Sequence, residues 1–394
     1  MKPRKKSRSF EKNQLISTGE CLQNESQISV CSNNNSKRIK LLFGKTYHPI
    51  EVSDWESYLK TCKSSFQKRY DDFSKSTMNR NDLIIIKTLA EGEFSRVSLM
   101  ANEGSHVLFA AKCINKRKIM NIHMAKQIVL QKQILKSIRF PFLLYLEGFF
   151  QDFNYIYFIM PFLIGDSMEN LLRKRCQLSE NFVKFYSAQV LLGLEYLHFL
   201  NIIYRDLKPE NILFDHHGYI KLIDFAFAKL LTNNRTYTFC GTLDYLAPEV
   251  ILQKGYGLSA DWWSFGVLLY ELCYGRSPYH DEDDENILEN IFFGKLKMPD
   301  WFSTSLKKLL KKLLTTDTTK RLGCSFKGAD DVKRHYWFKS IDFMALVNRN
   351  LKPPYVPDNE QLKMAVYLDS STESDLNSVT EDTKDKFDDV FKNI

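Results

Sequence analysis

The pattern of hydrophobic and polar residues divides the middle of the chain into two parts. Between Asp82 and Met160, short runs rich in β-branched and aromatic residues are separated by turn residues, a pattern typical of β-strands. The runs read DLIIIKTL, RVSLMA, HVLFAAKCI, FLLYLEGFF and YIYFIMPF. One helical pattern, at roughly 124–138, interrupts them. This part therefore predicts a small antiparallel sheet with one main helix.

Helical patterns dominate after residue 165. The two longest segments with an apolar stripe read NFVKFYSAQVLLGLEYLHFL and ADWWSFGVLLYELCYG. A further amphipathic helix is predicted at 52–73, because Trp55, Leu59, Cys62, Phe66 and Tyr70 recur at spacings of three and four residues. We therefore expect an α+β fold of two lobes, a small sheet lobe and a larger, mostly helical lobe, joined near 160–165.

Composition adds limits on where the protein works. The chain has 394 residues, of which 44% are hydrophobic and 26% charged, as in ordinary globular proteins. Its eight cysteines show no CxxC or Cys/His ligand spacing, which argues against a disulfide framework or a zinc site. No run approaches 18 apolar residues, so no membrane span is expected. We expect a cytoplasmic protein, with the nucleus as a second location.

The net charge of +8 is concentrated at the N-terminus. MKPRKKSRSF holds five basic residues in its first eight positions, and a polar stretch follows through CSNNNSK. We interpret residues 1–48 as a disordered basic tail, with a membrane-surface or nuclear-targeting role as the alternatives. No aromatic residues are interleaved with these charges, so nucleic acid is not expected as a partner. The acidic, Ser/Thr-rich stretch LDSSTESDLNSVTEDTKDKFDD predicts a mobile segment near the C-terminus.

The most specific string is YRDLKPEN at 204–211, called the catalytic loop below. Phosphoryl transfer needs a carboxylate that orients the attacking hydroxyl, a cation for the moving phosphoryl group and oxygen ligands for Mg²⁺. Asp206, Lys208 and Asn211 are residues of these types. Asp224 and Phe225 follow Asn211 after 13 residues, an order that a polar loop between two strands does not require.

Two further motifs complete the order found in protein kinases. AAK at 110–112 lies in the third strand-like run, where Lys112 could contact the α- and β-phosphates. GTLDYLAPE ends with the Ala247-Pro248-Glu249 triplet, which closes the activation segment, taken here as residues 224–249.

With these motifs the chain resembles a eukaryotic Ser/Thr protein kinase of the AGC group, and most of all the catalytic subunit of cAMP-dependent protein kinase. The resemblance runs from Val52 to Pro357 and includes TYTFCGTLDYLAPEVILQKGY, SADWWSFGVLLYELCYG, TKRLG and HYWFKSIDF. It implies a bilobal protein kinase fold. Its parts would be the basic tail 1–48, an N-terminal amphipathic helix and linker at 49–81, a kinase domain at 82–338 and an AGC-type C-terminal tail at 339–394. Within the domain, the N-lobe would be 82–162 and the C-lobe 163–338.

The resemblance also assigns roles to residues. Asp206 would be the catalytic base, Lys208 a contact of the γ-phosphate, and Asn211 and Asp224 the ligands of Mg²⁺. ATP would be the other cofactor. Residues of the glycine-rich loop, the strand that holds the lysine, and the connection between the lobes would bind ATP: Leu89, Ala90, Glu91, Gly92, Glu93, Phe94, Ser95, Arg96, Val97, Ala110, Lys112, Met160, Pro161 and Leu163.

Regulation and substrate preference follow from the same resemblance. Thr238 would be the phosphosite of the activation segment, with Arg205 and Lys229 as its cationic partners. Glu210 and Glu271 match positions that read an arginine two residues before the acceptor Ser/Thr. Ser167 replaces the glutamate that helps to read an arginine one residue further out, although Asp166 is adjacent. The implied partners are protein substrates with basic residues before Ser/Thr, and a separate regulatory subunit.

Three positions depart from the kinase pattern. The loop LAEGEFSRV keeps only Gly92 of three glycines, which predicts weaker nucleotide binding. Gln131 takes the place of the glutamate that pairs with Lys112; an amide could still accept a hydrogen bond from it, and slower turnover is expected. Ala226 replaces the glycine after Asp224 and Phe225, at a cost if that residue needs a positive φ.

The departures leave two functions open. Every side chain expected to touch metal, phosphate or the acceptor proton is present, which favours an active Ser/Thr kinase in cAMP-dependent signalling. The alternative is a pseudokinase or weakly active scaffold that binds nucleotide and partners. The C-terminal KFDDVFKNI also has two interpretations: Phe387 could approach adenine, or Phe387 and Phe391 could form a displaced hydrophobic motif, and the spacing fits neither cleanly.

Overall fold

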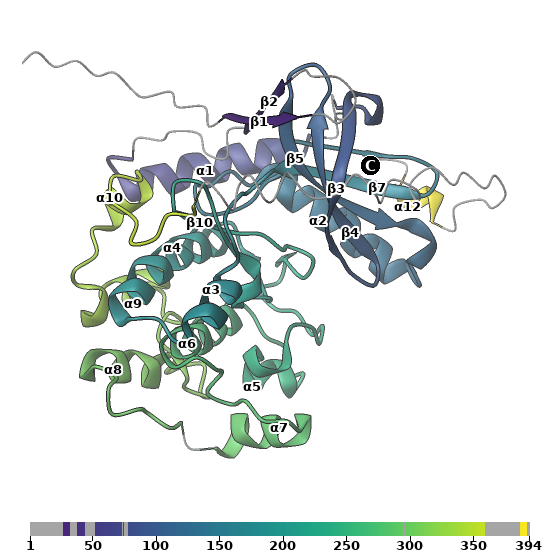
Figure 1. Cartoon of the computed structure of the whole chain (residues 1–394). Coiled ribbons are helices and arrows are strands. Elements are labelled where there is room, and N and C mark those ends of the chain that lie inside the picture. Colours follow the sequence, from purple (N-terminus) through teal and green to yellow (C-terminus); the bar gives the residue numbers. More distant parts are fainter. Residues whose placement is uncertain are drawn as a thin grey trace, which may run out of the picture.

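A small sheet lobe lies above a larger helical lobe in the computed structural model (Figure 1). The structure describes residues 27–31, 38–43, 52–72, 74, 78–294, 296–358 and 387–391. Among these residues, no helix has both the length and the apolar character needed to cross a membrane. The α+β, bilobal fold expected from the sequence is therefore confirmed.

The N-lobe is built on five antiparallel strands. These are β3 (Leu83–Glu91), β4 (Ser95–Asn102), β5 (Val107–Asn115), β6 (Gly148–Gln151) and β7 (Tyr155–Pro161). The central strand β5 pairs with β4 on one side and with β7 on the other. Phe109, Ala111 and Cys113 pack into one apolar cluster, whereas Leu108 and Ala110 belong to another. Because side chains alternate between the faces of a strand, Lys112 shares its face with Leu108 and Ala110.

Two more strands join this sheet at the beginning of its central strand. β1 (Gln27–Cys31) pairs with β2 (Arg38–Phe43), and β2 runs parallel to the beginning of β5. Both strands lie inside the stretch 1–48, for which the sequence predicted a disordered basic tail, so the structure differs from that prediction at these residues. The apolar runs within KRIKLLF and QISVC explain the difference, since strand pairing needs only short stretches of this kind. The remaining residues of 1–48 lie outside the described part.

Helix α2 (Ile122–Ser137) begins at Asn121, whose side chain accepts a hydrogen bond from the Met124 N–H at 2.9 Å. Helix α1 (Trp55–Tyr70) contacts both α2 and the C-lobe helix α4. Phe66 is buried on α1, and the Tyr70 ring lies 5.3 Å from it. The sequence therefore predicted both helices to within a few residues.

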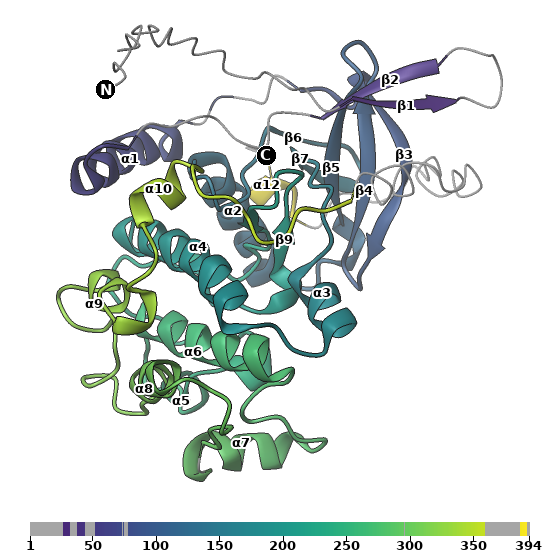
Figure 2. The same ribbon diagram turned by 60° about the vertical axis from the view of Figure 1, so that its left-hand side comes forward.

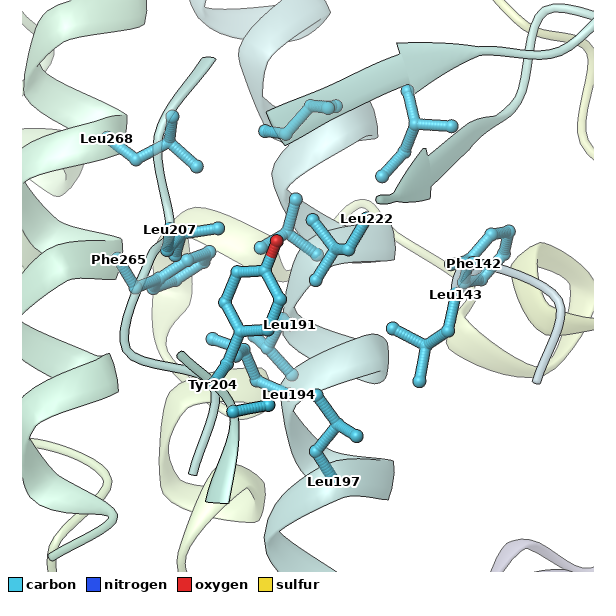
Figure 3. Close-up of a cluster of buried hydrophobic side chains, with 14 of the residues drawn as sticks. Phe142, Leu143, Leu191, Leu194, Leu197, Tyr204, Leu207, Leu222, Phe265 and Leu268 are labelled. Carbon is cyan, nitrogen blue, oxygen red and sulfur yellow. The ribbon is translucent and has the colours of Figure 1, made fainter. Parts of the chain in front are cut away.

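The C-lobe surrounds two buried helices, α4 (Glu180–Phe199) and α6 (Ser259–Tyr274). Figure 3 shows leucines of α4 meeting Tyr204, Leu207 and Leu222 across the core, with Phe265 and Leu268 of α6 opposite. The short strands pair as β9 (Ile212–Phe214) with β10 (Ile220–Leu222) and β8 (Ile202–Ile203) with β11 (Lys229–Leu230). The other helices are α3 (Met168–Arg175), α5 (Pro248–Ile251), α7 (Asp284–Phe293), α8 (Thr304–Leu313), α9 (Ala329–Lys333) and α10 (Phe343–Val347).

The C-terminal part returns to the core from α10. Figure 2 shows the chain after α10 running back along the C-lobe towards the sheet. Tyr355 accepts a hydrogen bond from the Tyr186 hydroxyl at 3.2 Å, and an added Cβ at Gly218 would lie 2.1 Å from the Tyr355 carbonyl oxygen. Gly218 also has a φ of +84°, so the hairpin between β9 and β10 requires glycine here.

The short helix α12 (Asp388–Phe391) lies against α2, beside the N-lobe (Figure 1). Phe391 is 1% exposed, and its carbonyl oxygen accepts a hydrogen bond from Gln151 Nε2 at 2.7 Å. Of the two interpretations of KFDDVFKNI, this placement of Phe391 fits a displaced hydrophobic motif.

Candidate active site

The buried carboxylate of Asp261 fixes the backbone at the beginning of the catalytic loop. Asp261 of α6 is fully buried, and it accepts hydrogen bonds from the backbone N–H groups of Tyr204 and Arg205, both at 2.9 Å. It also bonds His198 Nε2 at 2.8 Å. Arg205 has a φ of +71°, which costs free energy for a residue other than glycine. The Asp261 carboxylate therefore holds the loop in a conformation that the loop alone would not favour.

Asp206 follows this fixed point and is itself 7% exposed. Its Oδ2 accepts a hydrogen bond from Asn211 Nδ2 at 2.7 Å, and its Oδ1 lies 3.5 Å from Lys208 Nζ. Lys208 in turn donates to Thr242 Oγ1 at 2.9 Å. Burial raises the pKa of Asp206, and Asp224 adds to the rise, whereas Lys208 and Asn211 oppose it. An oriented carboxylate with a raised pKa is suited to accept a proton.

Lys112 and Asp224 meet where the two lobes face each other. Lys112 Nζ lies 3.3 Å from Asp224 Oδ1, and the same oxygen accepts the N–H of Ala226 at 3.0 Å. The Asn211 carbonyl accepts the N–H of Ile223 at 3.1 Å, which joins the catalytic loop to the residue before Asp224. The fold thus brings Lys112, Asp206, Asn211 and Asp224 into one site.

The structure changes the expectation for Gln131. This residue lies on α2 and is 4% exposed, but within the described part of the chain its side chain makes no hydrogen bond to Lys112 or to any other group. Lys112 turns to Asp224 instead. The expected cost at Ala226 is not incurred either, because its φ lies outside the left-handed region.

The glycine-rich loop is a hairpin between β3 and β4. Ala90 pairs with Val97 and Glu91 with Arg96, and the Gly92 N–H donates to the Ser95 carbonyl at 2.8 Å. An added Cβ at Gly92 would lie 3.3 Å from that carbonyl oxygen, closer than most such contacts. The other residues expected at the nucleotide line this hairpin, the neighbouring strands or the connection between the lobes: Leu89, Glu93, Phe94, Ala110, Met160, Pro161 and Leu163.

A cavity of about 740 Å³ opens between α2 and the activation segment. Its lining includes Phe94, Lys112 and Gln131 as well as Arg205 and Thr238. It therefore connects the Lys112 site with the expected phosphosite. A larger cavity of about 1000 Å³ is lined in part by Arg235 and Glu249 of the activation segment and by Tyr256.

Lys229 and Arg205 are each joined to Thr238 through one intervening residue. Lys229 Nζ donates to Thr236 Oγ1 at 3.1 Å, and Thr236 Oγ1 lies 3.5 Å from Thr238 Oγ1. Arg205 contacts the Tyr256 hydroxyl at 3.2 Å, and that hydroxyl donates to the Thr238 carbonyl at 2.5 Å. Burial, followed by the charge of Arg205, lowers the pKa of Lys229. Thr238 itself is exposed.

The expected substrate-reading residues differ in their surroundings. Glu210 is exposed, whereas burial and the charges of Glu210, Asp244 and Glu169 raise the pKa of Glu271 to about 8. The Tyr245 hydroxyl donates to Glu271. Asp166 already has a basic partner in this chain, because Lys174 Nζ lies 2.6 Å from it.

Sequence reasoning gave no role in the site to three residues that shape it: Asp261, Thr242 and Gln127. Gln127 of α2 donates from Nε2 to the carbonyl oxygens of Ala226, at 2.8 Å, and Ala228, at 3.2 Å. Asp261 was available in the quoted string SADWWSFG, yet nothing near it in the sequence indicates its distant partners.

Comparison with known proteins agrees with this geometry. The protein kinase domain family matches residues 83–338. The chain is 38% identical over 307 residues to cAMP-dependent protein kinase catalytic subunit 2 of Drosophila melanogaster, covering 77% of this chain and 86% of that protein. It is 41% identical over 276 residues to the human cAMP-dependent protein kinase catalytic subunit PRKX, covering 70% and 77%. For the cAMP-dependent protein kinase catalytic subunit of Arthrobotrys oligospora the identity is 40% over 285 residues, covering 72% and 55%.

The family match spans both lobes, the catalytic loop and the activation segment. Because more than half of the chain matches the protein kinase domain, the family assignment does not depend on single motifs. The chain therefore belongs to the protein kinase family, and it is similar to the catalytic subunits of cAMP-dependent protein kinase in the AGC group.

Proposed function

We propose that this chain is an ATP-dependent Ser/Thr protein kinase that transfers the γ-phosphate of Mg-ATP to Ser/Thr in basic sequence contexts. The observation that carries the proposal is the gathering of Lys112, Asp206, Asn211 and Asp224 into one site, held by the Lys112–Asp224 and Asp206–Asn211 contacts. A chain that had lost the chemistry would have no need to preserve this arrangement.

The donor atoms present fit Mg²⁺. Asn211 and Asp224 offer amide and carboxylate oxygens, and Mg²⁺ prefers oxygen ligands and is held in kinases by few side chains together with phosphate oxygens. When bound, Mg²⁺ neutralises charge on the phosphates. Lys112 on β5 would hold phosphate oxygens. Its ion pair with Asp224 holds the proposed phosphate-binding cation at a fixed distance from the proposed metal-binding carboxylate.

Asp206 has the role of accepting the proton of the substrate hydroxyl. The Asn211 amide fixes the orientation of its carboxylate, and the raised pKa makes it a better base than an exposed aspartate. Lys208, 3.5 Å from Asp206 Oδ1, supplies positive charge on the side where the phosphoryl group arrives. Thr242 contacts both residues and links them to the activation segment.

The test is phosphate transfer from Mg-ATP to a peptide with arginines two and three residues before a serine. Asp206→Asn should reduce kcat by about 10²–10⁴-fold, because a positioned base contributes that much. Asp300→Asn, which changes an exposed aspartate far from the site, should leave kcat unchanged. If the wild-type protein binds Mg-ATP but transfers no phosphate to serine or threonine, the scaffold function replaces this proposal.

A separate regulatory subunit that responds to cAMP is the partner that fits best. The three relatives named above carry cAMP-dependent protein kinase catalytic subunit in their names. By the same resemblance, Tyr237 and the loop around Thr242 belong to the surface that such a subunit covers, and Tyr237 is 64% exposed. A purified regulatory subunit should bind this chain and be released by cAMP. No binding at micromolar concentration would remove this part of the proposal.

A further inference from the structure

Helix α2 makes an unusual polar contact with the segment that follows Asp224. Residues 224–228 are called the metal loop here. Gln127 Nε2 donates to two carbonyl oxygens of this loop, that of Ala226 at 2.8 Å and that of Ala228 at 3.2 Å. One side-chain amide therefore donates hydrogen bonds to two carbonyl oxygens of the same turn.

The same turn fixes the metal-binding carboxylate. The Ala226 N–H donates to Asp224 Oδ1 at 3.0 Å, and the Ala228 N–H donates to the Phe225 carbonyl at 3.1 Å. The Phe225 side chain is fully buried. The Ala226 N–H and the Ala226 carbonyl belong to one residue, so Gln127, which holds the carbonyl, also restrains the N–H that bonds Asp224.

Gln131 lies one turn further along α2, and so on the same face as Gln127. In active kinases a glutamate at the position of Gln131 pairs with the strand lysine and couples this helix to the phosphates. Here Gln131 makes no hydrogen bond within the described residues, and Lys112 pairs with Asp224. Within the described part of the chain, the polar contact between α2 and the metal loop is the one made by Gln127.

We propose that Gln127 is a positioning residue that fixes Asp224 through the backbone of the metal loop, in place of an ion pair between α2 and Lys112. Both bonds join an amide to carbonyl oxygens, so the coupling carries no net charge. It therefore depends little on salt, unlike an ion pair, which salt screens. The inference rests on the proposed kinase function, but the contact itself does not.

The residue type is specific to this role. Leucine would fill the same space but leave two carbonyl oxygens without a partner, and a buried acceptor without a partner is costly. Glutamate is nearly isosteric but has no N–H to donate and places negative charge beside the carbonyls. Gln133 gives a matched control, because it lies on the same helix and its side chain makes no hydrogen bond to the metal loop.

The experiment compares the full chain with Gln127→Leu, Gln127→Glu and Gln133→Leu. In both Gln127 variants, backbone amide exchange of the peptide spanning 224–230 should become about tenfold faster, the loss expected for one or two hydrogen bonds. The Mg²⁺ concentration for half-maximal phosphate transfer should rise by about fivefold or more, with the peptide KM changed by less than about twofold. Gln133→Leu should match the wild-type protein in all three measurements.

Two results would overturn the proposal: exchange at 224–230 as slow in Gln127→Leu and Gln127→Glu as in the wild-type protein, or the same acceleration in Gln133→Leu. The nearly isosteric Gln127→Glu decides the matter if the leucine variant does not fold. Failure of the proposed kinase function would give a different result. The wild-type protein would then transfer no phosphate, while the exchange measurement would still report whether Gln127 holds the metal loop.

Discussion

At the scale of single residues, the site depends on how each charge is balanced. Asp206 is buried beside Lys208 and Asn211, and Asp224 has Lys112, so both carboxylates have a partner. Glu271 is different, because its nearest charged neighbours are the carboxylates Glu210 and Asp244. A carboxylate in this setting favours its neutral form until a cation arrives. An arginine of a substrate would be that cation.

The pKa of Glu271 gives a pH dependence with a definite sign. Burial first, and then the neighbouring carboxylates, raises this pKa to about 8, so the free protein holds Glu271 protonated at pH 7. Arginine binds the charged form better. The KM for a peptide with arginine two residues before serine should therefore fall as pH rises from 7 to 9, by up to about tenfold for a group with this pKa. Initial rates across this range measure it.

Two controls isolate the Glu271 carboxylate. Glu271→Gln should remove the pH slope and leave a high KM throughout. A peptide with citrulline in place of that arginine should also show a flat KM, because citrulline has nearly the shape of arginine without its charge. An equal slope for the arginine and citrulline peptides would assign the pH effect to another group.

At the scale of elements, α2 is held from several sides. Gln127 contacts the metal loop, α1 lies along it, and α12 packs against it near β6. The Lys116 ammonium lies 6.0 Å from the centre of the Phe391 ring, which places a cation near the buried aromatic ring. The C-terminal helix therefore belongs to the support of the N-lobe, although it is only four residues long.

Phe391→Ala should destabilise the protein by about 3 kcal/mol, because a fully buried aromatic side chain is removed and a cavity is left. Urea unfolding followed by tryptophan fluorescence measures the change. Phe326→Ala is the matched control: its side chain is 96% exposed, so the loss should stay within about 0.5 kcal/mol. Equal effects of the two substitutions would show that α12 does not contribute to stability.

The sequence predicted those elements whose pattern is local. The stripe on 52–73 and the helical run at 124–138 correspond to α1 and α2, and four of the five apolar runs correspond to β3, β4, β5 and β7. Of the run FLLYLEGFF, only the last three residues lie in a strand, β6. β1 and β2 were missed because their short apolar runs lie between polar and charged stretches. Asp261 and Gln127 could not be found in this way, because each acts on backbone groups 56 or more residues away in the chain. Only the folded chain brings such partners together.

At the scale of the whole molecule, the segment after α10 is joined to the C-lobe by a buried ion pair. Arg349 lies 2.6 Å from Asp215, with 6% and 0% of their side chains exposed. Asp215 also accepts the N–H groups of His217 and Tyr219, both at 3.0 Å, within the hairpin between β9 and β10. That hairpin follows the catalytic loop and leads to Asp224. The ion pair therefore connects the C-terminal part of the chain to the element that carries the site.

Arg349→Met should cost about 3–5 kcal/mol at pH 8, because Asp215 would be left as an unpaired buried charge. In the wild-type protein, burial raises the pKa of Asp215, but Arg349, His216 and Lys221 outweigh it and lower the pKa overall. Its stabilising contribution is therefore present above the ordinary aspartate value and is lost only as pH falls through the lower folded value. Without Arg349, we expect burial to be the dominant influence on the pKa of Asp215 and to raise it. The variant's Asp215 then favours its protonated form, and the variant loses stability as pH rises.

The pKa of Asp215 is lowered in the wild type and raised in Arg349→Met. The difference in unfolding free energy between the two proteins should therefore be smaller at pH 5 than at pH 8. Urea unfolding at the two pH values measures it. Asp215→Asn in the Arg349→Met background should remove most of the pH dependence, because the amide cannot ionise. A difference that is the same at pH 5 and pH 8 would mean that Asp215 stays ionised without Arg349. The hairpin and its neighbouring charges would then hold the carboxylate without help from the C-terminal segment.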